Sequence, residues 1–259
     1  MAPKAFADVS MITPNQTILP LLAVAFSMTL FHSADAHMCL KAGGVETGTF
    51  CEHEDGVRDG HGHESEGHGD AGRMVHIRRM TCKDGAVARW KPVGRDVVTF
   101  KVNDRAGVSL EVALAIRRGV LQWNRVQPFY VMQERASEEA DITIELLDDL
   151  LPGIVGAAQV KCRNAREGIR KAYVYLALKG VGSVEAQNMT AHEIGHAMGL
   201  GHSDHSHDLM DAKLAEKNID ERMICPSNLN RAGLIAGMHS YSIPEDEWSE
   251  MECWGRTSG

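Results

Sequence analysis

One run of eleven residues, HEIGHAMGLGH at 192–202, restricts this chain more than any other feature. His192 and His196 are four residues apart, so about one turn of helix places both imidazoles on the same face. Gly199 can adopt the positive φ that ends a helix and turns the chain, which brings His202 back towards the pair. Three imidazoles around one open position are the ligand set of a catalytic zinc ion. The run therefore predicts a helix, a sharp turn and a metal centre.

Glu193 stands beside the first of these histidines, one position round the helix. A carboxylate there can take a proton from a water molecule on the open coordination position. Zn²⁺ on His192, His196 and His202 lowers the pKa of that water from about 15.7 towards roughly 7. We therefore expect Glu193 to be the general base, and to return the proton to the leaving amine.

The complete HExxHxxGxxH pattern resembles that of the metzincin zinc endopeptidases, and within them the matrixin branch. The segment HDLMD supplies Met210, eight residues after His202, where this family has a methionine turn below the metal. The resemblance covers roughly residues 85–242. It implies an α+β fold in which a twisted mixed β-sheet carries an active-site helix and a C-terminal helix. It also implies one catalytic Zn²⁺ and a protein or peptide substrate.

Side-chain patterns support the same fold class without reference to any family. The segment 109–126 begins with Ser109, a candidate N-cap, has one apolar face and ends before Pro128, which predicts a helix. A second helix is predicted over 185–200, and residues 227–241 resemble the family's C-terminal helix. Strands are predicted over 97–102, 129–132, 141–146 and 172–178, where β-branched and aromatic residues are concentrated.

Several features depart from the matrixins of animals. Residues 147–171 contain no histidine, so we expect no second ordered zinc in that loop, and the sequence does not support a calcium site. The family's cysteine-containing latency peptide is missing. Cys82 precedes the predicted domain, but its use as a zinc ligand would leave an odd number of cysteines, so we expect a disulfide there. His205 and His207 are expected to be exposed loop residues, because three imidazoles and a water molecule complete a tetrahedral site.

The amino terminus is typical of an exported protein. An apolar run from Ile18 to Phe31 is followed by the small residues Ala34 and Ala36, which predicts a signal peptide over 1–36. The run is shorter than the roughly 20 residues that span a bilayer. We therefore expect a secreted protein with no stable membrane insertion after cleavage, and an uncleaved membrane anchor is the alternative.

Cysteine usage agrees with export, since all six cysteines follow Ala36. An even set in an exported chain predicts three disulfides, for which 15 connectivities exist. A short loop closed by Cys39 and Cys51 is one candidate. The cysteines are Cys39, Cys51, Cys82, Cys162, Cys225 and Cys253.

The segment before the catalytic region has little apolar content. Residues 52–72 alternate glycine, histidine and acidic residues, which predicts a flexible linker. Four histidines there could bind extra transition metals weakly: His53, His61, His63 and His68. The whole segment 37–84 is expected to be either a disulfide-held appendage or a propeptide lying across the cleft. The catalytic domain is predicted over 85–242, and a tail over 243–259 is expected to be tied back by Cys253.

Composition and the intact Glu193 narrow the functional alternatives. The formal net charge of −8, with no stripe of Lys and Arg, argues against nucleic acid as a partner. A secreted metal-binding protein with a silent protease-like domain is one alternative, but a silent site has no need of Glu193. A zinc hydrolase acting on bonds other than peptides is another. We predict a secreted zinc endopeptidase.

Overall fold

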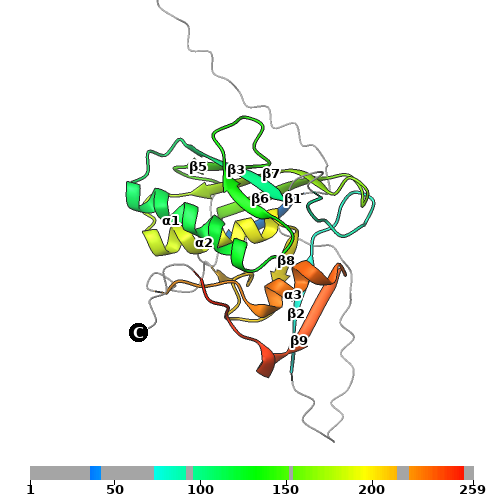
Figure 1. Ribbon diagram of the computed structural model, residues 1–259. Coiled ribbons are helices and arrows are strands. Elements are labelled where there is room, and N and C mark those ends of the chain that lie inside the picture. Colours follow the sequence, from blue (N-terminus) through cyan, green and yellow to red (C-terminus); the bar gives the residue numbers. More distant parts are fainter. Residues whose placement is uncertain (1–35, 42–72, 92–95, 152–153, 215–221, 254–259) are drawn as a thin grey trace, which may run out of the picture. The chain divides into compact units, whose positions relative to one another are not determined.

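The structure is a computed structural model that describes residues 36–41, 73–91, 96–151, 154–214 and 222–253 (Figure 1). All of these lie within the unit Ser33–Gly259. The predicted signal peptide up to residue 35 and the His-rich tract lie outside the described residues. No helix in the described part of the chain is long and apolar enough to cross a bilayer.

The larger of two sheets has six strands and mixed direction. Neighbouring strands are parallel among β4, β3, β5 and β7, whereas β6 is antiparallel to both β7 and β1. This mixed sheet confirms the α+β class. Across the sheet, the order is β1 (Ala36–Lys41), β6 (Ile154–Cys162), β7 (Ile169–Ala177), β5 (Ile142–Leu147), β3 (Val97–Asp104) and β4 (Val131–Glu134).

Two helices lie side by side on one face of this sheet (Figure 1). They are α1 (Leu110–Leu121), which continues as the 3₁₀ turn η1 (Gln122–Arg125), and α2 (Ser183–Ala197). Ser109 caps α1 as expected, accepting a hydrogen bond from the Val112 amide. The helices approach closely at Gly119, where a Cβ atom would lie 2.6 Å from the carbonyl of Gln187. Close contact of this kind packs α2 tightly against its neighbour.

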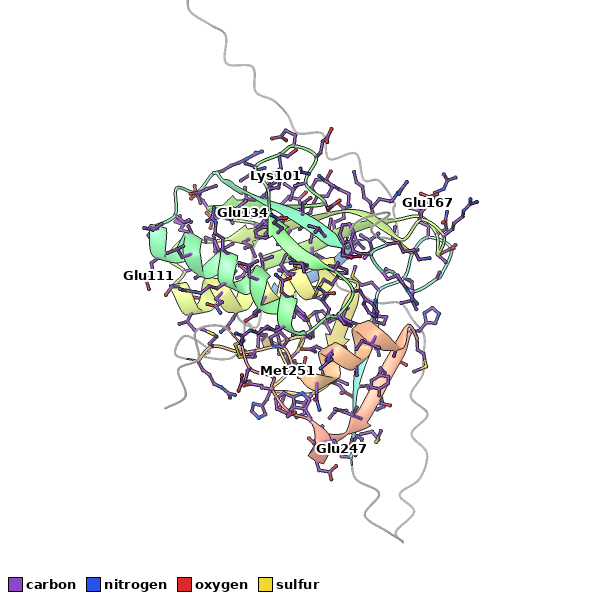
Figure 2. All side chains as sticks on the ribbon, viewed as in Figure 1. Lys101, Glu111, Glu134, Glu167, Glu247 and Met251 are labelled. Atoms are coloured by element: carbon purple, nitrogen blue, oxygen red, sulfur yellow. A yellow bond between two sulfur atoms is a disulfide. The ribbon has the colours of Figure 1, made fainter. Side chains whose placement is uncertain are left out.

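The second sheet is small and joins segments from three parts of the chain. Its central strand β2 (Met74–Arg79) lies between β8 (Leu200–Ser203) and β9 (Ser240–Pro244). Helix α3 (Asn228–Ala236) packs on it, with Gly233 against Ile77, and a short 3₁₀ turn, η3 (Glu245–Glu247), follows β9. The buried core is mostly apolar. Acidic residues such as Glu111, Glu134 and Glu247 are exposed at the periphery (Figure 2).

The buried Arg79 of β2 ties this sheet to the end of α2. Its guanidinium donates to the carbonyls of Gly199 at 2.8 Å, Ala88 at 2.7 Å and Gly233 at 2.5 Å. Burial lowers the Arg79 pKa to about 10, so the group stays charged at neutral pH. Residues on both sides of the predicted boundary at 85 therefore pack together, and removing residues 73–84 would remove the central strand of the sheet.

Two disulfides are present in the described residues. Cys82 is bonded to Cys162 at the end of β6, and Cys225 is bonded to Cys253 in the tail. The expectation of a disulfide at Cys82 is confirmed, so its thiol is not free to bind a metal. The expected tether through Cys253 is also confirmed, and its partner is now identified. The Cys39 side chain and Cys51 lie outside the described part of the chain.

Several predicted elements need correction. The strand expected over 129–132 begins two residues later, the first helix ends at Leu121, and the second begins at Ser183 and ends at Ala197. Strand β6 was not predicted, because its glycine and alanines have low strand propensity. Strands β1, β2, β8 and β9 were not predicted either. Each pairs with residues far away in the sequence, so its hydrogen-bonding partners leave no local pattern.

Candidate metal centre

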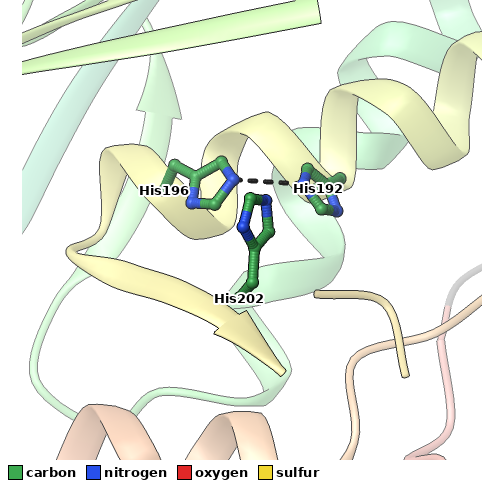
Figure 3. Close-up of side chains that lie close together, drawn as sticks. All are labelled: His192, His196 and His202. Atoms are coloured by element: carbon green, nitrogen blue, oxygen red, sulfur yellow. Dashed lines mark hydrogen bonds between the residues drawn. The ribbon is translucent and has the colours of Figure 1, made fainter. Parts of the chain in front are cut away.

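Three histidines converge at the end of α2 (Figure 3). His192 and His196 project from the helix, and Gly199, with the predicted positive φ of +91°, turns the chain into β8, which carries His202. One ligand atom from each imidazole lies within 4.8 Å of the other two. The Nε2 atoms of His192 and His196 are 3.1 Å apart. Tetrahedral ligands at about 2.05 Å from one zinc ion would be about 3.3 Å apart, so this pair of nitrogens has the spacing of two ligands on one ion.

Backbone carbonyls orient two of the rings. The Nδ1 atom of His192 lies 2.7 Å from the Leu209 carbonyl, and that of His196 lies 2.9 Å from the Leu200 carbonyl. A carbonyl can only accept, so each Nδ1 carries the proton and each Nε2 keeps its lone pair for a metal. Burial lowers the His192 pKa to about 3, with a smaller contribution from His202. The His192 imidazole is therefore neutral at pH 7, as a metal ligand must be.

The Glu193 carboxyl is buried beside these rings. Neither of its oxygens has a hydrogen-bond partner among the described residues. Desolvation raises its pKa to about 8. A buried carboxyl without partners is costly to maintain. A cation and a water molecule beside the carboxyl would offset this cost. The buried Glu193 carboxyl is therefore a second observation, after the converging imidazoles, that fits a metal site.

Strand β6 covers this carboxyl at Gly156. A Cβ atom on Gly156 would lie 2.6 Å from Oε1 of Glu193 and 3.1 Å from its Cδ. Only glycine therefore allows the strand to lie so close to the side chain. Sequence reasoning did not identify Gly156, because its backbone needs no positive φ and the contact partner is 37 residues away in the chain.

We expect Gly156→Ala to reduce any turnover supported by Glu193 by roughly 100-fold, because a misplacement of about 1 Å at a catalytic group costs this much. Metal affinity should change little, since the three atoms nearest to the added Cβ all belong to Glu193 and none to a histidine. The measurement is kcat/KM beside zinc content. Gly182→Ala is the control, because nothing lies within 4 Å of its added Cβ. Equal activity in both variants would contradict the role of Gly156.

Met210 lies directly below the metal-binding helix. It is fully buried, and a Cβ atom on Gly195 would lie 2.3 Å from its sulfur. Gly195 is between the two helical histidines, so the methionine packs under the same turn that presents them. The position fits the methionine turn expected from the resemblance, while its role stays a prediction.

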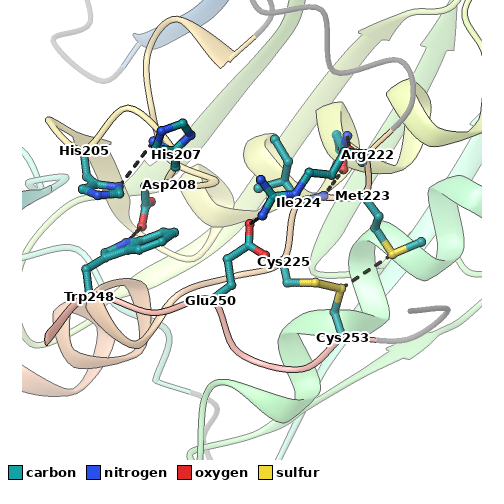
Figure 4. Close-up of polar contacts among 11 residues, drawn as sticks. His205, His207, Asp208, Arg222, Met223, Ile224, Cys225, Trp248, Glu250 and Cys253 are labelled. Atoms are coloured by element: carbon teal, nitrogen blue, oxygen red, sulfur yellow. Dashed lines mark hydrogen bonds and ion pairs between the residues drawn. A yellow bond between two sulfur atoms is a disulfide. The ribbon is translucent and has the colours of Figure 1, made fainter. Parts of the chain in front are cut away.

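Asp208 organises the segment that follows the third histidine, and its contact with Trp248 is drawn in Figure 4. This buried carboxylate accepts from the Met210 amide at 2.8 Å, the Asn230 amide group at 2.7 Å and the Trp248 indole at 3.0 Å. The Ser227 hydroxyl also donates to it. Asp208 was not identified from the sequence, since three of its four donors are on or next to α3 and in the tail. The only local signal was an acidic residue two positions before Met210.

His205 and His207, which follow the third histidine of the site, differ in exposure. His205 is buried and stacks on Trp248, with ring centroids 4.1 Å apart, so the expectation that it is exposed was wrong. Burial lowers its pKa. His207 is exposed as expected, and neither residue joins the candidate metal group. The four histidines of the predicted weak metal tract lie outside the described residues.

Comparison with known protein families gives one match, which covers about a fifth of the chain. Residues 175–226 match the family model of the matrixins, a segment that contains α2, β8 and the turn with Met210. The prediction of a matrixin-like region is therefore confirmed. No curated protein matches the chain.

The solved structures that match the chain are distant from it in sequence. The GM1-bound form of the ECX AB5 holotoxin is 13% identical, with 64% of this chain and 89% of that chain covered and a TM-score of 0.42. Myroilysin is 15% identical, with coverage of 44% and 52% and a TM-score of 0.32. High choriolytic enzyme 1, a hatching-enzyme zinc protease of the medaka fish Oryzias latipes, is 17% identical, with coverage of 48% and 54% and a TM-score of 0.33. The match spans about half the length of the last two chains.

Proposed function

We propose that this chain, with its matrixin-like region, is a secreted zinc endopeptidase. The observation that carries the proposal is the convergence of three imidazoles on one point beside a buried, unpartnered Glu193 carboxyl. The family match over 175–226 supports protein or peptide as the substrate class.

Each residue of the site has a role in this proposal. His192, His196 and His202 hold the ion through neutral nitrogens. Bound zinc supplies a Lewis acid for the peptide carbonyl and acidifies a water molecule. Glu193 takes the proton from that water and delivers it to the leaving amine. Burial gives Glu193 a pKa of about 8 in the metal-free protein, and a nearby cation lowers the pKa towards the neutral range, where a group both accepts and returns protons.

The disulfides support export, because such bonds persist in oxidising compartments. We propose that the signal peptide over 1–36 directs secretion. We also propose that any later removal of N-terminal residues stops before Met74, because β2 is the central strand beside β8. Sequencing the amino terminus of the secreted protein tests this, and a mature start after residue 84 would contradict it.

The function is tested with purified secreted protein and a library of quenched peptides. We expect about one tight zinc ion per chain and cleavage that stops when a hydroxamate chelator is added. Zinc binding without cleavage of any peptide, in protein with both disulfides formed, would contradict the proposal. Cleavage that persists after complete removal of the metal would contradict it as well.

The metal-free protein should lose stability as pH rises from about 4.5 to 8. In this interval the folded state keeps the Glu193 proton, while the unfolded chain, with an ordinary pKa of 4.5, has released it. The free energy of unfolding should therefore fall by about 1 kcal/mol per pH unit. Urea unfolding of metal-free wild type and Glu193→Gln at pH 5 and pH 8 measures the effect as a difference. Parallel pH profiles for the two proteins would show that Glu193 is not protonated in the fold.

A further inference from the structure

A basic pocket lies at the end of strand β6, beside the Cys82–Cys162 disulfide. Its volume is about 370 Å³, and of its seven lining residues four are cations and none is acidic. The cations are Lys83, Lys161, Arg163 and Arg170. A cluster of this sign stands out in a chain whose net charge is −8.

A disulfide, a backbone hydrogen bond and strand pairing hold the residues of the pocket in place. The Lys83 amide donates to the Cys162 carbonyl at 3.2 Å, so the disulfide and this bond keep Lys83 beside the strand. Lys161 is directly opposite Lys171 on β7, and its ammonium lies 5.0 Å from the centre of the Tyr173 ring. Glu167 is the nearby counter-charge, 4.0 Å from Arg170. Cations held close together create a positive potential, which attracts an anionic partner.

The pocket lies on the same strand that covers the catalytic carboxyl. Gly156 of β6 is against Glu193, and Lys161 is five residues further along. At about 3.3 Å per residue, the two positions are about 17 Å apart. An extended peptide lying along β6 would therefore reach both the reacting site and the pocket.

The edge of β6 already accepts an extended segment, and the pairing gives its direction. Strand β1 runs antiparallel to β6, with Ala36 opposite Gln159 and Lys41 opposite Ile154. The amino-terminal end of such a segment points towards the pocket. A substrate that replaces β1 on this edge in the same direction places residues before its scissile bond near Lys161 and Arg163.

We propose that the basic pocket is a subsite for acidic side chains of the substrate, roughly three to six residues before the scissile bond, given the spacing along the strand. The inference rests on the proposed peptidase function and names its substrate preference. An acidic peptide is favoured over nucleic acid as the occupant, because the pocket and Gly156 lie on the same strand and the net charge of the chain, −8, repels a polyanion.

The test uses the full secreted chain and peptides that share one cleaved core. Three Asp, Ser or Lys residues are placed either three to six positions before the scissile bond or at the same distance after it. Asp before the bond should raise kcat/KM roughly tenfold over Ser at low salt, as expected for one or two solvent-exposed charge contacts, and the gain should shrink at high salt. Asp after the bond should have little effect.

Charge reversal tests the residues directly. The double variant Lys161→Glu, Arg163→Glu should lose the preference for Asp before the bond and prefer Lys there. Arg135→Glu is the control, because this exposed cation follows β4 at the opposite edge of the sheet. It should keep the wild-type preference.

The possible outcomes distinguish failure of the subsite proposal from failure of the proposed peptidase function. Cleavage of all peptides at equal rates, or a preference for acidic residues after the bond, would overturn the subsite and leave the peptidase function standing. Competition by a single-stranded oligonucleotide, with no preference among the peptides, would overturn the acidic-peptide ligand. If the wild type cleaves none of the peptides, including the Ser peptide, both proposals fail.

Discussion

Glu193→Gln is expected to lower kcat by about 10² to 10⁴-fold, the range that a positioned acid–base group contributes. Glutamine has the same size and fits beneath Gly156, but it cannot accept a proton. Zinc should remain at about one equivalent per chain, because none of the three imidazoles is changed. The measurement is kcat/KM on a quenched peptide together with zinc content of the same sample.

Glu185→Gln is the matched control, since it makes the same chemical change on the first turn of the same helix. It should leave both activity and zinc content at wild-type levels. If Glu193→Gln still hydrolyses the peptide at the control's rate, the base lies elsewhere. Loss of zinc from Glu193→Gln would instead give the carboxyl a part in binding the metal.

Asp208→Ala is expected to destabilise the metal-free protein by on the order of 4 kcal/mol. The change leaves buried donors on Met210, Asn230, Ser227 and Trp248 without their acceptor, and each unsatisfied buried group costs about 1–3 kcal/mol before relaxation. Urea unfolding of metal-free protein measures the loss.

The same variant should bind zinc about 10 to 100-fold more weakly, the usual cost of losing support behind a metal ligand. Asp208 holds the turn through the Met210 amide, and the neighbouring Leu209 carbonyl orients the His192 ring. Competition with a chromogenic chelator gives the affinity without reference to activity.

Asp204→Ala is the control for Asp208. Asp204 belongs to the same segment but is exposed, and it accepts one hydrogen bond, from the His76 amide. Its loss should cost about 1 kcal/mol and leave zinc affinity unchanged. Equal stability and equal zinc affinity in the two variants would show that the Asp208 contacts do not support the site.

The convergence of the three histidines and the strands of the parallel part of the sheet could be predicted from local sequence patterns. His192, His196 and His202 lie within eleven residues, so the pitch of one helix and the turn at Gly199 are enough to bring them together. Strands β3, β5 and β7 were predictable for a similar reason, because β-branched runs mark buried strands locally.

The surroundings of these histidines depend on contacts between distant parts of the chain. Gly156 gains its importance from contact with Glu193, and Asp208 gains its own from donors on α3 and the tail. Strand β2, which lies before the predicted domain boundary, completes the sheet that carries His202. These contacts join residues far apart in the chain. Local periodicity and spacing describe only near neighbours, so a single sequence contains no pattern from which such contacts can be predicted.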